Sequence, residues 1–173
     1  MREFAKQVIT QTAGTLGLSA DSVMNAPDKQ SLLLPTPRIE LEYMTEDLTR
    51  SFKRVARFPT PSQEVTHRSV RKRIYKCALT VRAVVRSDDE DWLAGFVKSL
   101  LVELPVKVAD DDNNLVTIKA NKAVRGGFEK KMVEVFKKRS NTLHIVFSGM
   151  ICRDDSLPVI REVDVRNGLT INI

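Results

Sequence analysis

The chain has 173 residues, of which 42% are hydrophobic and 29% are charged, and its net charge is +6. These values are typical of one globular domain with a real core, and they exclude a disordered or fibrous chain. No apolar run approaches the ~20 residues that a membrane-spanning helix needs. The first thirteen residues include Glu3 and Lys6 and lack the apolar core of a secretory signal. We therefore expect the protein to stay in the compartment where it is made.

The chain begins with an amphipathic pattern. Phe4, Val8 and Ile9 lie at helical spacing and predict a first helix from about Arg2 to Leu16. The segment 19–37 that follows is polar at first and contains several prolines, which forbid a continuing helix. It is therefore predicted to be a long, irregular arm.

Two strands are predicted next. Apolar and charged residues alternate over 38–43, which is typical of a half-buried strand. The basic segment 50–58 fits a strand and a short helix equally well, and prolines and polar residues predict an exposed loop at about 58–70. The clearest strand covers Arg71–Arg86, which is long for a globular protein, so it is expected to bend, to bulge or to project beyond the body of the fold. One face of this strand should carry Tyr75, Cys77, Leu79, Val81, Ala83 and Val85, and the other Lys76, Thr80, Arg82 and Arg86.

A central helix is predicted at about 88–104. Ser87 and Glu90 have the spacing of a capping box, in which Ser87 is the N-cap and Glu90 reaches back to it. The acidic first turn suits the positive end of the helix dipole. Apolar residues at helical spacing continue from Trp92 to Leu104, and Pro105 ends the helix.

The rest of the chain has the texture of strands joined by turns. The predicted strands are 106–108, 115–118, 130–137, 143–152, 159–165 and 169–173. The predicted turns are 110–114, Gly126-Gly127, 138–141, Asp154-Asp155 and Asn167-Gly168. Because strands and helices do not alternate regularly, a parallel doubly wound sheet is not expected. We predict a single α+β domain over 1–173, with a mixed, mainly antiparallel, twisted sheet packed against the central helix and the N-terminal helix.

Catalytic motifs are missing from the sequence. His67 in a predicted loop and His144 in a predicted strand lie near no serine or cysteine in a nucleophile motif. The acidic segment 110–114 resembles part of a calcium loop but lacks its glycine and its bidentate glutamate, so it is interpreted as a solvated turn. We therefore expect no enzymatic activity, no catalytic residue, no cofactor and no metal.

The two cysteines, Cys77 and Cys152, each lie in an apolar stretch that is predicted to be a strand. Neither shows metal-ligand spacing. Buried free thiols are the favoured interpretation, and a disulfide between them stays open.

Basic residues are the main candidates for an interaction surface. They form three clusters: Arg50, Lys53, Arg54 and Arg57; Arg68, Arg71, Lys72 and Arg73; and Lys137, Lys138 and Arg139. They can keep strand edges soluble, or they can contact phosphates. The first interpretation is favoured, because charge alone is a non-specific signal and no stacking platform, zinc finger or helix-turn-helix accompanies it.

The order of the predicted helices and strands resembles that of a known protein family. A helix leads through a polar arm to Pro37-Arg38-Ile39-Glu40-Leu41, the long strand with Ile74–Val81 runs into the helix Trp92–Leu104, and Leu143–Cys152 precedes a terminal strand pair. In this order the chain resembles the head–tail completion and tail-terminator (neck) proteins of long-tailed bacteriophages. The resemblance implies a twisted mixed sheet packed by helices and a structural protein without enzymatic activity or catalytic residues. It also implies assembly in the host cytoplasm into the virion, as a homo-oligomeric ring, typically a hexamer, between the tail tube and the head connector.

Two segments are expected to make the subunit contacts of such a ring, the arm Ser19–Pro37 and the loop Phe58–Ser69. Contact with DNA is an open question, because the basic clusters would be repeated around the channel. The alternative function is a basic nucleic-acid-binding accessory protein, and a small enzyme with dispersed active-site residues is a third.

Overall fold

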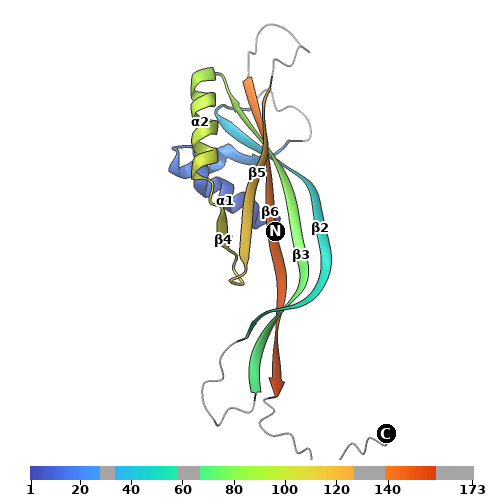
Figure 1. Ribbon diagram of the computed structural model, residues 1–173. Coiled ribbons are helices and arrows are strands. Elements are labelled where there is room, and N and C mark those ends of the chain that lie inside the picture. The colour runs from blue at the N-terminus through green and yellow to red at the C-terminus, as the bar shows by residue number, and fades with distance from the viewer. Residues whose placement is uncertain (28–33, 58–66, 127–138, 159–173) are drawn as a thin grey trace, which may run out of the picture.

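The computed structural model describes residues 1–27, 34–57, 67–126 and 139–158. The elements are α1 (Arg2–Thr15), the 3-10 turn η1 (Ala20–Ser22), β1 (Val23–Asn25), β2 (Arg38–Arg57), β3 (His67–Ser87), α2 (Glu90–Glu103), β4 (Lys107–Ala109), β5 (Leu115–Gly126) and β6 (Arg139–Pro158). The strands form one sheet in the order β1-β2-β3-β6-β5-β4, in which only the β1–β2 pair is parallel. The predicted α+β class is confirmed: a mixed, mainly antiparallel and curled sheet is packed by two helices (Figure 1).

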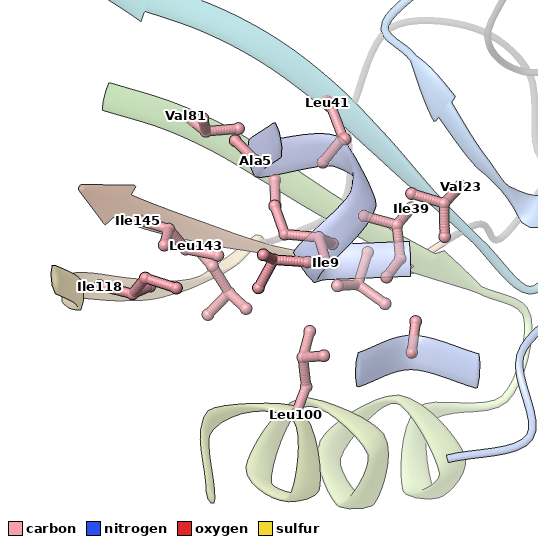
Figure 2. Close-up of a cluster of buried hydrophobic side chains, with 14 of the residues drawn as sticks. Ala5, Ile9, Val23, Ile39, Leu41, Val81, Leu100, Ile118, Leu143 and Ile145 are labelled. Carbon is pink, nitrogen blue, oxygen red and sulfur yellow. The ribbon is translucent and has the colours of Figure 1, made fainter. Parts of the chain in front are cut away.

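The core lies between the two helices and one face of the sheet. The predicted alternation along β3 is confirmed, because Cys77, Leu79, Val81, Ala83 and Val85 are all buried. From the helices, the core takes Ala5, Val8, Ile9 and Ala13 of α1 and Leu93, Phe96, Val97 and Leu100 of α2. Figure 2 shows Ile9 and Leu100 pointing into one cluster with Leu143 and Ile145 of β6. This face is called here the helix face, and most of its buried apolar side chains lie where the helices cover it.

Three strands are much longer than the rest of the sheet. The strands β2, β3 and β6 have 20, 21 and 20 residues, and they continue well past the helices as a three-stranded ribbon (Figure 1). This distal ribbon comprises residues 48–57, 67–77 and 149–158. Its strands are bulged between Arg50 and Lys53, and again between Arg73 and Tyr75. The predicted long strand therefore both bulges and projects.

The outer strands of the sheet stop short of the distal ribbon. The strand β1 pairs with β2 only as far as Leu41, and β5 pairs with β6 only as far as Ser148. Within the described ranges, both edges of the distal ribbon therefore lack a partner strand.

Several predicted boundaries are wrong, and the β3–β6 ladder gives the reason. The two strands pair antiparallel from Ser87↔Arg139 to His67↔Pro158, with one bulge between Arg73 and Tyr75. Residues 139–141 are therefore strand and not part of a turn, and residues 67–70 are strand and not loop. Asp154-Asp155 also lies in the strand, because its carboxylates pair with basic side chains on β3. The ambiguous segment 50–57 is strand.

The predicted helix cap is also wrong. Asp89 is the N-cap of α2, and its Oδ1 accepts hydrogen bonds from the backbone N–H of Asp91 and Trp92 at 2.9 and 3.0 Å. Ser87 is still the last residue of β3, opposite Arg139, and its Oγ accepts from the Asp89 N–H. The cap therefore comes two residues later than the spacing indicated.

The predicted arm at 19–37 is partly ordered into the sheet. It contains η1 and the strand β1, which pairs in parallel with the start of β2. Residues 28–33 lie outside the described residues, as do the predicted strand 130–137 and the hairpin around Asn167-Gly168. No described helix is long and apolar enough to cross a membrane.

Candidate assembly surface

The helix face of the distal ribbon carries apolar side chains that no described element covers. The register sets Leu48, Cys77 and Gly149 in one row across the ribbon and Arg50, Tyr75 and Ile151 in the next. The exposed large hydrophobic residues of the ribbon include Leu48 and Phe52 on β2 and Ile151 on β6, and Val55 is exposed in the bulge between Arg54 and Ala56. Leu48, Phe52 and Ile151 are 56%, 66% and 49% exposed. Single exposed apolar residues are normal, but a run of them indicates a contact surface.

A pocket of about 380 Å³ opens where this face meets the start of α1. It is lined by Met1, Glu3, Phe4, Glu46, Leu48, Cys77, Asp110, Asp111, Asp112, Met150 and Ile151. Three parts of the chain meet there: the first turn of α1, the ribbon strands and the turn between β4 and β5. The size is within the range of ligand-binding pockets. We call it the acidic pocket.

The start of α1 can lie close to the sheet because Gly149 has no side chain. A Cβ atom at Gly149 would lie 2.7 Å from the Met1 Cε and 3.3 Å from the Val116 Cγ2. The neighbouring turn is ordered by Asp110, whose Oδ1 accepts hydrogen bonds from the backbone N–H of Asp112 and Asn114. This confirms the predicted turn and brings its carboxylates to the rim of the pocket.

The lining carries five carboxylates and no lysine or arginine side chain. Glu46 forms an ion pair with Arg2 just outside the lining, at 3.6 Å. The pKa of the Tyr43 hydroxyl is raised, first by burial and then by the Glu3 carboxylate. Glu46 similarly adds to burial in raising the pKa of the Cys77 thiol. The acidic pocket thus gathers five carboxylates on a protein with a net positive charge, and Arg71 lies beside it, where its guanidinium donates to the Asp112 backbone carbonyl at 3.1 Å.

Two of the four residues in the second basic cluster, Arg71 and Lys72, form ion pairs within the ribbon. The Arg71 Nε lies 2.8 Å from the Asp154 Oδ1, and the Lys72 Nζ lies 2.7 Å from the Asp155 Oδ2. Arg153 also pairs with Asp155, at 2.7 Å. These partners lower the pKa of both aspartates. Paired cations of this kind are less available for phosphate contact.

Part of the first basic cluster is exposed. The Arg50 guanidinium lies 4.7 Å above the centre of the Phe52 ring, and Lys53 and Arg54 are exposed beside it. None of these three cations pairs with a carboxylate of the described chain. We call Arg50, Phe52, Lys53, Arg54 and Val55 the basic tip.

The remaining predicted site residues are dispersed. Arg73 donates to the Ser51 Oγ at 3.2 Å. Arg57 and Arg68 are placed at the far end of the ribbon, opposite Val70 and Leu157, whereas Arg139 is at the other end of β6, opposite Ser87. Lys137 and Lys138 lie outside the described residues. The three clusters therefore do not form one surface.

The described cysteines and histidines lie at separate positions on β3 and β6. Both cysteines are free thiols, and burial raises the pKa of Cys77 and of Cys152, which favours the unreactive protonated form. Of the predicted histidine positions, His67 begins β3 and His144 lies within β6. No group of three or more histidine, cysteine or acidic residues in the described ranges could hold a metal ion.

Sequence reasoning found the exposed cations but missed the surface around them. The signal for the apolar residues was available, since Leu48, Phe52 and Val55 recur among charges in 44–57. The acidic pocket had no such signal, because its lining comes from segments far apart in the chain.

Comparison with known proteins adds no identification, because no protein-family model matches this chain and no curated protein matches its sequence. The functional conclusion therefore depends on the geometry described above and on the order of the elements.

Proposed function

We propose that this protein is a structural subunit of phage virion assembly, which forms a closed ring that terminates the tail tube and joins it to the head connector. The observation that carries the proposal is the distal ribbon, whose two edges pair with no described strand and whose exposed apolar side chains lie outside the core. A protein that acted alone would gain nothing from exposing this surface and would risk aggregation.

The two edges support a ring in particular. The open edge belongs to β2 on one side of the ribbon and to β6 on the other, so the two edges are not equivalent. An edge can bind an extended segment or a second edge through backbone hydrogen bonds. A contact between unlike surfaces is heterologous, and such contacts form a closed ring when the rotation between subunits closes. The link to phage tails comes from the resemblance in element order.

Electron microscopy of purified tail tubes tests this function directly. After incubation with the protein, we expect extra density at one end of each tube and none along its sides. The matched control is the same tubes with an unrelated basic protein of similar size. Tubes with bare ends after incubation at saturating protein would contradict the proposal.

Nucleic-acid binding is the second candidate, and the exposed cations of the basic tip favour it. Each phosphate contact contributes about −0.9 to the slope of log K against log salt concentration on duplex DNA. Three contacts by Arg50, Lys53 and Arg54 would give a slope of about −3. Fluorescence anisotropy with a labelled duplex measures this slope, and an absence of binding at low salt would remove the candidate.

A further inference from the structure

We propose that the basic tip of one copy docks into the acidic pocket of a second copy of this chain. The inference deepens the proposed function and rests on it, because it names the contact that would join neighbouring subunits. The occupant is identified by charge, by apolar fit and by the path of β2.

Charge complementarity is the first argument. The acidic pocket has the carboxylates of Glu3, Glu46 and Asp110–Asp112 in its lining and no basic side chain. The basic tip has three exposed cations within five residues. Opposite potentials of this kind steer association and set the relative orientation of two surfaces. Two copies that each have a net charge of +6 would repel each other, whereas the carboxylates of the acidic pocket attract a basic surface.

Apolar fit is the second argument. Phe52 is the most exposed aromatic residue among the large hydrophobics of β2, and Val55 follows it. The lining of the acidic pocket includes the apolar side chains of Phe4, Leu48 and Ile151. A buried aromatic anchor within a polar rim is the arrangement found at the centre of many interfaces. Arg50 already stacks on the Phe52 ring, so the anchor is partly ordered before it binds.

The path of β2 excludes docking within one chain. Leu48 lines the acidic pocket, and Phe52 lies four residues further along the same extended strand, about 13 Å away at ~3.3 Å per residue. Pairing with β3 on both sides of the bulge between Arg50 and Lys53 fixes the path of the strand. The tip therefore cannot fold back, and its partner must be a pocket on another copy. Since tip and pocket are different surfaces, the contact can repeat from copy to copy.

Charge reversal tests the contact. The tip variant K53E/R54E has a net negative tip and an acidic pocket, and the pocket variant E3K/D111K/D112K has a basic tip and a pocket whose lining becomes net positive, because three lysines then outnumber Glu46 and Asp110. Each variant alone should fail to associate, with the dissociation constant raised about a hundredfold or more because like charges then meet. Light scattering of full-length protein at low salt measures the mass. The control K98E/K119E makes the same change of charge as the tip variant, at exposed positions outside both surfaces, and should keep the wild-type mass.

A mixture of the two variants gives the decisive result. In a 1:1 mixture each acidic tip meets a basic pocket and each basic tip meets an acidic pocket, so an assembly of wild-type mass should return. Misfolded variants could not restore it. The contact is overturned if either variant alone keeps the wild-type mass, if the mixture stays dissociated, or if the wild-type protein is monomeric throughout the concentration range. An oligomer that persists in both variants would reject the contact and leave the ring, whereas rescue without binding to tail tubes would reject the phage function and leave the contact.

Discussion

At the scale of single residues, the most unusual feature is a buried ionic group at the start of β2. The Glu40 carboxylate accepts a hydrogen bond from the Arg38 Nε at 2.8 Å and from the Arg86 Nε at 2.9 Å. Arg38 and Glu40 are almost completely buried. Arg38 also donates to the backbone carbonyls of Leu34 and Pro35, which ties the preceding segment to the sheet. Buried charges are tolerated only when they are paired in this way.

Removing this carboxylate should be costly. Glu40→Ala leaves two guanidinium groups without their shared partner, and we expect the free energy of unfolding to fall by about 3–5 kcal/mol. The matched control is Glu42→Ala, two residues along the same strand, where the ion pair with Arg82 is exposed and removal should change stability by about 0–1 kcal/mol. Urea denaturation of both variants measures the difference. Equal losses of unfolding free energy in the two variants would show that the buried ionic group stabilises the fold no more than the exposed ion pair does.

The sequence could not distinguish Glu40 from Glu42. Both alternate with apolar residues in 38–43, and the pattern alone predicts that both face solvent. The difference arises because Arg86 from β3 and Arg38, which also donates to the Pro35 carbonyl, both bind the Glu40 carboxylate. Contacts between distant segments of this kind leave no periodic signal in the chain.

At the scale of elements, α2 stabilises the fold through one face. Leu100 is 1% exposed and lies in the core cluster, whereas the next residue, Leu101, is 37% exposed. We expect Leu100→Ala to lower the free energy of unfolding by about 2–5 kcal/mol, because it leaves a cavity between α2 and the sheet. Leu101→Ala removes the same atoms at the surface and should cost less than about 1 kcal/mol. Thermal denaturation compares the two, and a larger loss for Leu101→Ala would contradict the packing described here.

The ion pairs of the distal ribbon should respond to acid. Hydrogen bonding by Arg71 lowers the pKa of Asp154, and hydrogen bonding by Lys72 and Arg153 lowers that of Asp155. A lowered pKa means that the pairs stabilise the folded state above the ordinary aspartate value of about 3.9, and that this contribution is lost as the pH falls through the lower folded value.

Carboxyl NMR titration measures these two groups. We expect Asp154 and Asp155 to titrate below about 3.9, and Arg71→Gln to move Asp154 back toward that value while leaving Asp155 near its wild-type midpoint. A midpoint for Asp154 at or above the ordinary value would show that the pair with Arg71 does not persist in solution.

The elements with a strong periodicity of apolar residues could be predicted from the sequence, but the lengths of these elements could not. The first helix, α2 and the buried face of β3 follow from the spacing of apolar residues. The extension of β6 through Asp154-Asp155 could not be predicted in this way. Acidic pairs usually mark turns, and only the basic residues on β3 make this pair suitable for a strand. The cap at Asp89 was missed for a similar reason, since Ser87 was already paired in the sheet.

At the scale of the whole molecule, the core and the distal ribbon have different roles. The two helices bury one face of the sheet along one part of its long strands, and the distal ribbon continues beyond them (Figure 1). The ribbon carries exposed apolar residues, exposed cations and two edges that no described strand pairs with. This division supports the proposal that the ribbon is completed by other copies of the chain.

The solution mass of the wild-type protein tests this central claim most directly. Light scattering across a wide concentration range, at low and at high salt, distinguishes a closed ring from an open series of oligomers. We expect one discrete species near six subunits at low salt, which loses mass as salt screens the contact between basic tip and acidic pocket. A strict monomer at every concentration and salt would contradict the account.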